Sequence, residues 1–210
     1  MLTKRVIPKI LIKKLAIQKE NIIVSLTTKK FKDNKIIGSP LSQATIFNDS
    51  KADEIILIDL DHNIIDQEKL NLISSIAENI FIPITVGGGV KTIEDIRILL
   101  SKGADRVVIN GSNLTAEKEN FIKNAVTYFG SQCIVISIDI INLGDEFAIY
   151  DYNKKQNLKI NIKEFMNKVQ NLAIGEIIIT DVKRDGCKVG FDKEFFDQIK
   201  DLIKVPTIIS

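Results

Sequence analysis

The sequence contains a series of short runs rich in Ile and Val, separated by segments in which apolar residues recur with the spacing of a helix. Within each run the apolar positions are nearly continuous rather than alternating. This pattern is typical of strands in a parallel sheet that is covered on both faces. The runs predict seven strands, at residues 5–12, 54–60, 82–86, 105–110, 132–139, 176–181 and 205–210.

Helix-start signals precede four of the segments between these strands. A capping side chain satisfies N–H groups that are otherwise unpaired at a helix start, and a first-turn proline has no N–H to satisfy. The signals are Ser39 before Pro40, Thr92 before Glu94 and Asp95, Thr115 before Glu117, and Asn161 before Glu164. The alternating strands and helices close most economically into a parallel barrel through right-handed crossovers, or stay open as a doubly wound sheet.

A half-chain repeat favours the barrel. The segment EIILIDLD from Glu54 resembles EIIITDVK from Glu176, and IPITVG from Ile82 resembles VPTIIS from Val205 at nearly the same offset. Two stacked half-barrels make a (βα)8 barrel. We therefore predict an α/β fold of the TIM (βα)8 type, C-terminally truncated to about seven strands and six helices. It forms one domain over residues 1–210, with half-barrel repeats at 1–127 and 128–210.

Two polar insertions, at residues 13–37 and 142–160, interrupt the alternation. In a barrel both follow strands and lie on the C-terminal face, where long loops often serve the substrate. The alternative is that both are ordinary surface hairpins.

Charge and composition point to small-molecule chemistry. The chain has 29 basic and 27 acidic side chains and a net charge of +2, which gives no reason to expect nucleic acid or a membrane surface as a partner. No apolar stretch reaches the roughly 18 residues that span a bilayer. Two cysteines are too few for a disulfide framework or a metal cluster. We expect a cytoplasmic protein without a metal or other cofactor.

The sequence VGGGV at 86–90 is the strongest candidate binding motif. Without side chains, the N–H groups of Gly87, Gly88 and Gly89 can approach an anion closely, and a helix starting near Thr92 adds a favourable dipole. The motif predicts a phosphate site, the alternative being a tight turn with positive φ. Asn110 and Gly111, which follow the next strand, could add donors to the same phosphate.

Acidic residues gather where predicted strands end. A carboxylate at the carboxyl end of a barrel strand faces the substrate and can act as a general acid or base. The alternatives for each are helix capping and turn formation, which suit Asp185 before Gly186 in particular. The four positions are Asp59, Asp139, Asp181 and Asp185.

Charged residues also stand at the opposite, amino ends of the predicted strands. They are Arg5, Glu54, Arg106 and Glu176, on four different strands. Two positive and two negative side chains could form a neutral ring across the N-terminal opening of a barrel, or simply a solvated rim.

Together these segments resemble the cyclase subunit of imidazole glycerol phosphate synthase, a barrel enzyme of histidine biosynthesis that receives ammonia from a glutamine amidotransferase partner. The resemblance covers essentially the whole chain. It rests on MLTKRVIP at the start, FIPITVGGGVKTIEDIRILLSKGADRVVIN at 81–110, FGSQCIVISID at 129–139 and GEIIITDVKRDGCKVGFD at 175–192. The segment at 129–139 separates this subunit from the related sugar isomerase of the same pathway, which needs no ammonia.

The resemblance implies roles for matching positions. Gly87 to Gly89, Asn110 and Gly111 fall where the family binds one phosphate of its bisphosphorylated substrate, and Asp185 with Gly186 where it contacts the other. Asp139 matches one of two catalytic aspartates. Thr180 and Lys19 match positions lining the substrate groove. Arg5, Glu54, Arg106 and Glu176 match the charged gate through which ammonia enters, and Asp105 lies where the partner docks to form a heterodimer.

The sequence departs from the family at two places. The family's other catalytic aspartate lies in a Cys-Leu-Asp-Val stretch, which here reads Lys9-Ile10-Leu11-Ile12 and places Leu11 at the aspartate's position. Leucine transfers no proton, so we expect weak or absent activity on the usual histidine intermediate. The same loss is typical of a paralogous branch in surface-polysaccharide clusters, which resembles the synthase and amidinates a nucleotide-linked sugar. The second departure is the ending. In the family, the strand that ends here at Ser210 runs directly into a Gly-Gly pair, and loops after strands 7 and 8 complete the second phosphate site.

Two hypotheses follow. The first is an ammonia-using lyase or synthase subunit that works with a glutaminase partner on a phosphorylated small molecule. The second is a truncated, non-catalytic paralogue that only binds the glutaminase.

Overall fold

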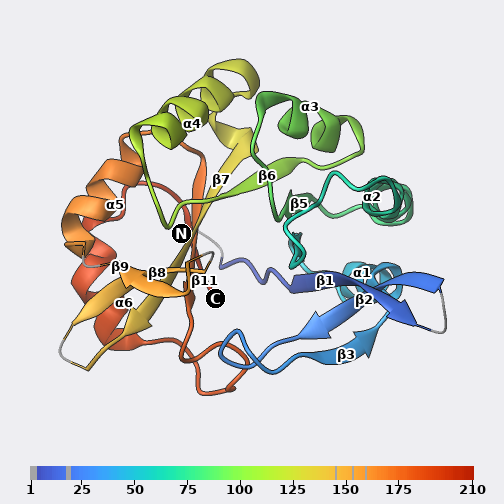
Figure 1. The fold of residues 1–210 in the computed structure, drawn as a ribbon, viewed down its shortest axis with the longest axis horizontal. Coiled ribbons are helices and arrows are strands. Elements are labelled where there is room, and N and C mark those ends of the chain that lie inside the picture. The colour runs from blue at the N-terminus through green and yellow to red at the C-terminus, as the bar shows by residue number, and fades with distance from the viewer. Residues whose placement is uncertain (1–3, 18–19, 145, 153, 159) are drawn as a thin grey trace. The chain divides into compact units, whose positions relative to one another are not determined.

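The computed structural model describes residues 4–17, 20–144, 146–152, 154–158 and 160–210 (Figure 1). By their contacts these residues divide into two units. The first contains the described residues up to 27 together with 34–108, and the second contains 28–33 and 109–210. The division falls inside one strand, β6 (Arg106–Asn110), which begins in the first unit and ends in the second.

The first unit is a sheet with strand order β6-β5-β4-β1-β2-β3 and three helices. Neighbouring strands from β6 to β1 are parallel, whereas β2 and β3 add to β1 as an antiparallel hairpin. Helix α1 contacts β1, β2 and α2. The elements are β1 (Lys9–Ile17), β2 (Glu20–Thr27), β3 (Lys35–Gly38), α1 (Pro40–Asp49), β4 (Ile55–Asp59), α2 (Gln67–Asn79), β5 (Ile84–Gly87) and α3 (Ile93–Ser101).

The second unit contains three further parallel strands, in the order β11-β10-β7, and a β8-β9 hairpin that pairs antiparallel with the end of β7. Helix α4 contacts β7, and α5 contacts β8. The elements are α4 (Ala116–Phe129), η1 (Ser131–Cys133), β7 (Ile134–Asn142), β8 (Phe147–Asp151), β9 (Gln156–Leu158), α5 (Ile162–Gln170), β10 (Glu176–Asp181), α6 (Lys193–Ile199), η2 (Lys200–Leu202) and β11 (Thr207–Ile209).

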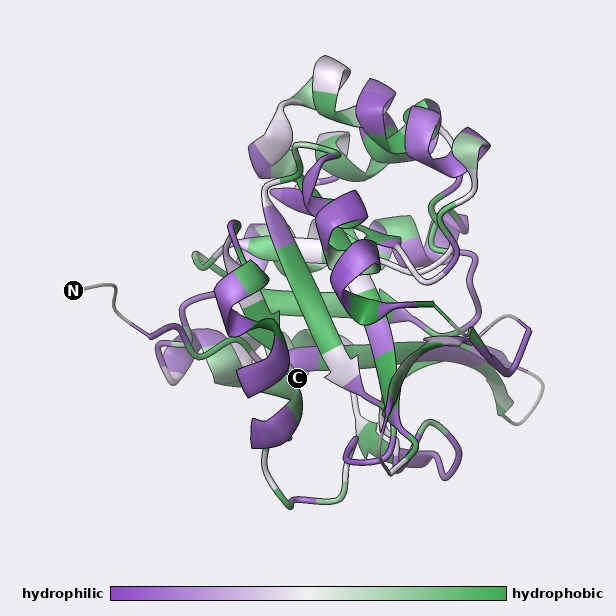
Figure 2. Ribbon diagram, turned by 90° about the vertical axis from the view of Figure 1, so that its left-hand side faces the viewer, coloured by the Kyte–Doolittle hydropathy of each residue, from purple (hydrophilic) through white to green (hydrophobic). Residues whose placement is uncertain are grey.

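Local sequence explains most of these boundaries. Thr92, Thr115 and Asn161 each accept a backbone N–H of their own first helical turn, as predicted. All seven predicted strands are present, with ends that differ by a few residues. Figure 2 shows the strands mostly in the hydrophobic colour and the helices in both colours, which is the pattern of a covered parallel sheet.

The two insertions form hairpins. Beyond Ile12, β1 leaves β4 and continues beside β2, so residues 13–37 hold the end of β1 together with β2 and β3. Residues 142–160 hold β8 and β9. These antiparallel additions are hard to predict because their sequences are polar and each strand has only one covered face.

The alternation of seven parallel strands with six α-helices among the described residues is that of a TIM (βα)8-type fold, as predicted. The half-barrel boundary at 127 and 128 stays a prediction. In the part of the chain that the structure describes, we find no helix with the length and apolar character that a bilayer crossing requires.

Candidate functional site

The three glycines at the end of β5 lie against neighbouring backbone. Gly88 and Gly89 have φ of +113° and +88°, in the region that favours glycine. A Cβ on Gly88 would lie 2.3 Å from the carbonyl oxygen of Asp59, and one on Gly89 would lie 2.0 Å from that of His62. A Cβ on Gly87 would meet the Val108 side chain at 2.6 Å. The fold itself therefore requires glycine at all three positions.

The start of α3, next to this triplet, is closed by its own side chains. Thr92 accepts the N–H of Asp95 at 3.0 Å, and the Asp95 carboxylate accepts the N–H groups of Lys91 and Thr92 at 2.8 and 2.9 Å. This capping box already places a negative charge at the helix start. An anion at the triplet would consequently depend on the glycine N–H groups rather than on the end of α3.

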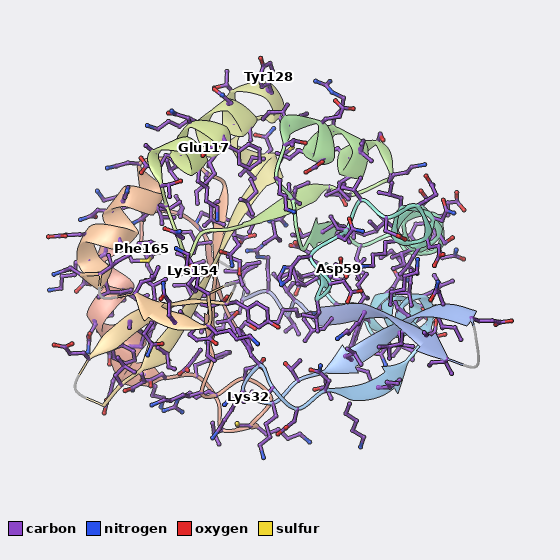
Figure 3. The ribbon with its side chains drawn as sticks, viewed as in Figure 1. Lys32, Asp59, Glu117, Tyr128, Lys154 and Phe165 are labelled. Carbon is purple, nitrogen blue, oxygen red and sulfur yellow. The ribbon has the colours of Figure 1, made fainter. Side chains whose placement is uncertain are left out.

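The carboxylate of Asp59, which is labelled in Figure 3 at the end of β4, is bonded to the loop that follows this strand. It is fully buried and accepts the N–H groups of Asp61 and Asn63 at 3.2 and 2.8 Å. It also pairs with the ammonium of Lys69 at 2.7 Å. These contacts fit the formation of a turn, which was the alternative to an acid/base role for Asp59.

In the second unit, Asp139 and Thr180 lie directly opposite each other on the neighbouring strands β7 and β10. In parallel strands, residues in register project from the same face of the sheet. Both are mostly buried, with 8% and 2% of their surface exposed. The structure thus places the predicted acid/base residue beside the predicted groove residue.

Asn110 ends β6 and Gly111 follows it, and both make contacts within the second unit. The Asn110 side-chain oxygen accepts both the N–H and the hydroxyl of Ser112, at 3.0 and 2.6 Å. The N–H of Gly111 donates to the carbonyl of Ser137 at 2.7 Å. That donor is already used by the protein, and a Cβ on Gly111 would lie 2.4 Å from the Ile136 side chain, so the contacts explain this glycine without a phosphate, whose binding stays a prediction.

Asp185 and Gly186 contact the segment 28–33. The hydroxyl of Thr28 donates to the Asp185 carboxylate at 2.6 Å, and the N–H of Lys30 donates to the Asp185 carbonyl at 2.9 Å. Gly186 has φ +64°, and a Cβ there would lie 1.9 Å from the Thr28 carbonyl oxygen. These contacts explain both residues without a phosphate, whose binding stays a prediction.

A second group of charges surrounds Asp181 at the end of β10. Arg184 lies 3.5 Å from Asp181 and 3.4 Å from Asp192, and the amide of Asn142 donates to Asp192 at 3.1 Å. Burial raises the pKa of Asp181 above its ordinary value, and the charge of Asp192 adds to this. Burial would also raise the pKa of Asp192, but the N–H of Phe195 and the Asn142 amide lower it overall.

These charges border a cavity of about 220 Å³ within the second unit. Its other walls are mainly apolar. They include Ile140, Ile179, Val189, Phe191, Phe195, Phe196 and Ile209.

We predict that Asp181→Asn stabilises the chain at about pH 7. A raised folded pKa means that the folded chain holds this proton more tightly than the unfolded chain. Stability from this group is therefore present below the ordinary value of 3.8 and is lost as the pH rises through the folded pKa. Asparagine carries no charge and still accepts the N–H of Lys183. The ion pair that the substitution removes involves a half-exposed Arg184 and contributes little.

Urea unfolding of Asp181→Asn and wild type at about pH 7 and about pH 4 measures this effect, and the advantage of the variant should shrink at the lower pH. Asp192→Asn is the matched control. The folded pKa of Asp192 is lowered, so its charge stabilises the chain above the unfolded value. That variant should lose stability at about pH 7. Equal signs for the two variants would contradict the assignment.

Three of the four predicted gate residues meet at the amino ends of the strands in the first unit. Glu54 is 1% exposed, its carboxylate lies 3.5 Å from the guanidinium of Arg5, and it also pairs with Arg106. The hydroxyl of Thr85 donates to it at 2.5 Å. Sequence reasoning missed Thr85, because only the register of β5 and β6 places it opposite Arg106.

The structure gives fewer contacts for the remaining predicted residues. Glu176 begins β10 in the second unit and is 2% exposed, so its membership of the ring stays a prediction. The Asp105 carboxylate accepts the N–H of Ile84 at 2.8 Å. Leu11 lies in β1 opposite Ile58, between buried neighbours. Lys19 lies outside the described residues.

Comparison with known proteins agrees with this fold. The family described as "Histidine biosynthesis protein" matches residues 5–210. Imidazole glycerol phosphate synthase subunit HisF of Exiguobacterium sp. is 34% identical over 211 residues, which covers the whole chain and 79% of that protein. HisF of Staphylococcus saprophyticus is 37% identical over the whole chain and 81% of its own length.

A Vibrio vulnificus protein, provisionally named imidazole glycerol phosphate synthase subunit hisF2, is 38% identical over 179 residues. The match covers 85% of this chain and 65% of that protein. The family match over residues 5–210 and the relatives that align with the whole chain show that the chain belongs to the histidine biosynthesis protein family, among relatives named as HisF subunits of imidazole glycerol phosphate synthase.

Proposed function

We propose that this chain is the synthase-type subunit of a glutamine-dependent complex, in which ammonia from a glutaminase partner is added to a phosphorylated sugar substrate. The names of the HisF relatives support the reaction class.

The proposal rests on a difference between the two ends of β4, β5 and β6 in the first unit: charged side chains lie at the amino end, and glycines follow β5 at the carboxyl end. At the amino end, Arg5 and Arg106 neutralise the buried Glu54. At the carboxyl end, β5 runs into Gly88 and Gly89, which pack without side chains against the backbone of Asp59 and His62 and whose N–H groups we assign to an anion. Both ends fit a reaction in which ammonia enters at the charged end and a phosphate group is bound at the other.

Asp139 is the acid/base group of this proposal. Joining ammonia to a carbon centre requires that protons move between nitrogen, oxygen and the protein, which a positioned carboxylate can do. Thr180 lies beside it on the same face of the sheet, and its hydroxyl can orient a polar group of the substrate.

Leu11 favours a substrate other than the usual histidine intermediate. It occupies an apolar stretch between Ile10, which is 2% exposed, and Ile12, which is fully buried. A second proton-transferring group is therefore absent at this position. We propose that the substrate is a nucleotide-linked sugar that undergoes amidination, as in the polysaccharide branch. The same residue supports the second candidate, a paralogue that binds the glutaminase without turnover.

Ammonium-dependent turnover by the purified chain tests the proposal. The chain is incubated with ammonium salts and either a nucleotide-linked sugar or the bisphosphorylated ribulosyl intermediate, and nitrogen-15 incorporation is followed by mass spectrometry. We expect label in the nucleotide-linked product. Label only in the imidazole product would redirect the substrate assignment to histidine biosynthesis. No label with either substrate, together with retained glutaminase binding, would establish the non-catalytic candidate instead.

A further inference from the structure

The most unusual side chain in the first unit is a completely enclosed lysine. Lys69 is in the first turn of α2 and only 1% of its surface is exposed. Its ammonium lies 2.7 Å from the Asp59 carboxylate and 3.0 Å from that of Asp61. Lysine is almost never fully buried unless it is paired, because taking an ammonium out of water is costly. The burial of Lys69 therefore depends on these two carboxylates.

The two carboxylates in turn hold the loop between β4 and α2. Asp59 accepts the N–H groups of Asp61 and Asn63. Asp61 accepts the N–H of Lys14, in the second half of β1, at 2.9 Å. Burial would raise the pKa of Asp61, but the Lys14 N–H and the Lys69 ammonium lower it below its ordinary value. Backbone N–H groups of the loop thus hold the Asp59 carboxylate, and a backbone N–H group of β1 holds that of Asp61.

This loop is the surface on which the glycine triplet rests. The N–H of Ile64 donates to the carbonyl of Gly88 at 3.1 Å. The Cα of Gly88 packs on Asp59 and that of Gly89 on His62, closely enough that neither position has room for a Cβ. The backbone that we assign to phosphate binding therefore lies directly against the residues that Lys69 holds.

The carboxylates of Asp59 and Asp61 would repel an anion bound beside them, and a cation that pairs with them reduces this repulsion. Lys14 cannot be that cation, because its own ammonium pairs with Asp66 and Glu68 at 3.4 and 3.0 Å. Lys69 is the described cation that contacts both Asp59 and Asp61. The field at the glycine backbone consequently depends on Lys69, even though a buried ammonium cannot touch a ligand there.

We propose that Lys69 is a positioning residue for the phosphate site at Gly88 and Gly89: it fixes the supporting loop and offsets one of the two negative charges of Asp59 and Asp61. This inference rests on the proposed function, since it presupposes that the triplet binds phosphate. Lys69 acts through the loop and through charge, not by contact with substrate.

The experiment measures the affinity of the full chain for inorganic phosphate by calorimetry, with urea unfolding of each variant in parallel. Lys69→Met should weaken phosphate binding by about tenfold or more in samples that are still folded. Lys69→Met combined with Asp59→Asn restores the net charge of the cluster and keeps an oxygen that accepts the Asn63 N–H. This double variant should recover affinity to within about threefold of wild type. Lys35→Met, at an exposed position of β3, is the control for the loss of one positive charge and should bind like wild type.

The recovery distinguishes an electrostatic and positioning role from a purely structural one. Folded Lys69→Met with wild-type affinity overturns the inference, as does a folded double variant that binds no better than Lys69→Met. If Lys69→Met alone does not fold, the double variant is compared with wild type and with Asp59→Asn alone, which should bind more tightly than wild type. A wild-type chain that binds no phosphate overturns the phosphate site itself and with it this inference.

Discussion

Asp139→Asn is expected to lower the ammonia-dependent turnover of the chain by about 10²- to 10⁴-fold, because asparagine can neither accept nor return a proton. Asparagine has nearly the same shape, so the packing of β7 against β10 should persist. The effect should fall on kcat, since the proton moves during the reaction and substrate binding depends on other groups. Steady-state kinetics with ammonium and the nucleotide-linked sugar measure both constants.

The control for this prediction is Asp151→Asn. Asp151 is also a buried carboxylate on a strand of the second unit, 3% exposed, but it lies on β8 and accepts the N–H of Lys154 at 3.2 Å. We expect this variant to keep its turnover. Wild-type kcat in Asp139→Asn would remove Asp139 from the mechanism, whereas equal losses in both variants would indicate a general structural effect.

Gly88→Ala is expected to destabilise the chain by about 3 kcal/mol or more. Two costs combine. A φ of +113° is strained for any residue with a Cβ. The Cβ would also lie 2.3 Å from the carbonyl oxygen and 2.7 Å from the nitrogen of Asp59, which are backbone atoms that cannot turn away. Urea unfolding followed by circular dichroism gives the free energy of unfolding.

Gly38→Ala separates the two costs within the same unit. Gly38 also has a positive φ, of +133°, but an added Cβ would have nothing within 4 Å. Its loss should be limited to about 1–2 kcal/mol of backbone strain. Similar losses in the two variants would show that close packing on Asp59 is not what demands glycine at position 88.

The glycine triplet shows how far a motif can be interpreted. Three successive glycines predicted either a phosphate site or a turn with positive φ. The structure explains each glycine by packing and backbone angle, through Asp59, His62 and Val108. The phosphate role is compatible with that geometry but needs its own test. Sequence alone could not separate the two interpretations, because the atoms that crowd these glycines come from β4 and the loop after it and from β6.

The acidic residues at strand ends show the same limit. Their positions were correctly expected at carboxyl ends, but Asp59 is enclosed with Lys69, and Asp185 is bonded to Thr28. Asp181 borders the cavity of about 220 Å³, and Asp139 lies beside Thr180, whose place in a groove stays a prediction. Which carboxylates bind loops and which face a groove depends on partners that lie far away in the chain.

The amino-acid sequence by itself determined the parallel strands and the starts of α3, α4 and α5, because these follow from local apolar runs and from capping residues within one turn. The tertiary structure alone decided the pairing of Lys69 with Asp59, the meeting of Thr85 with Glu54 and the contact of Thr28 with Asp185. Such contacts join residues 10 to 157 positions apart. Their existence depends on how strands are ordered in the sheet, which no local pattern encodes.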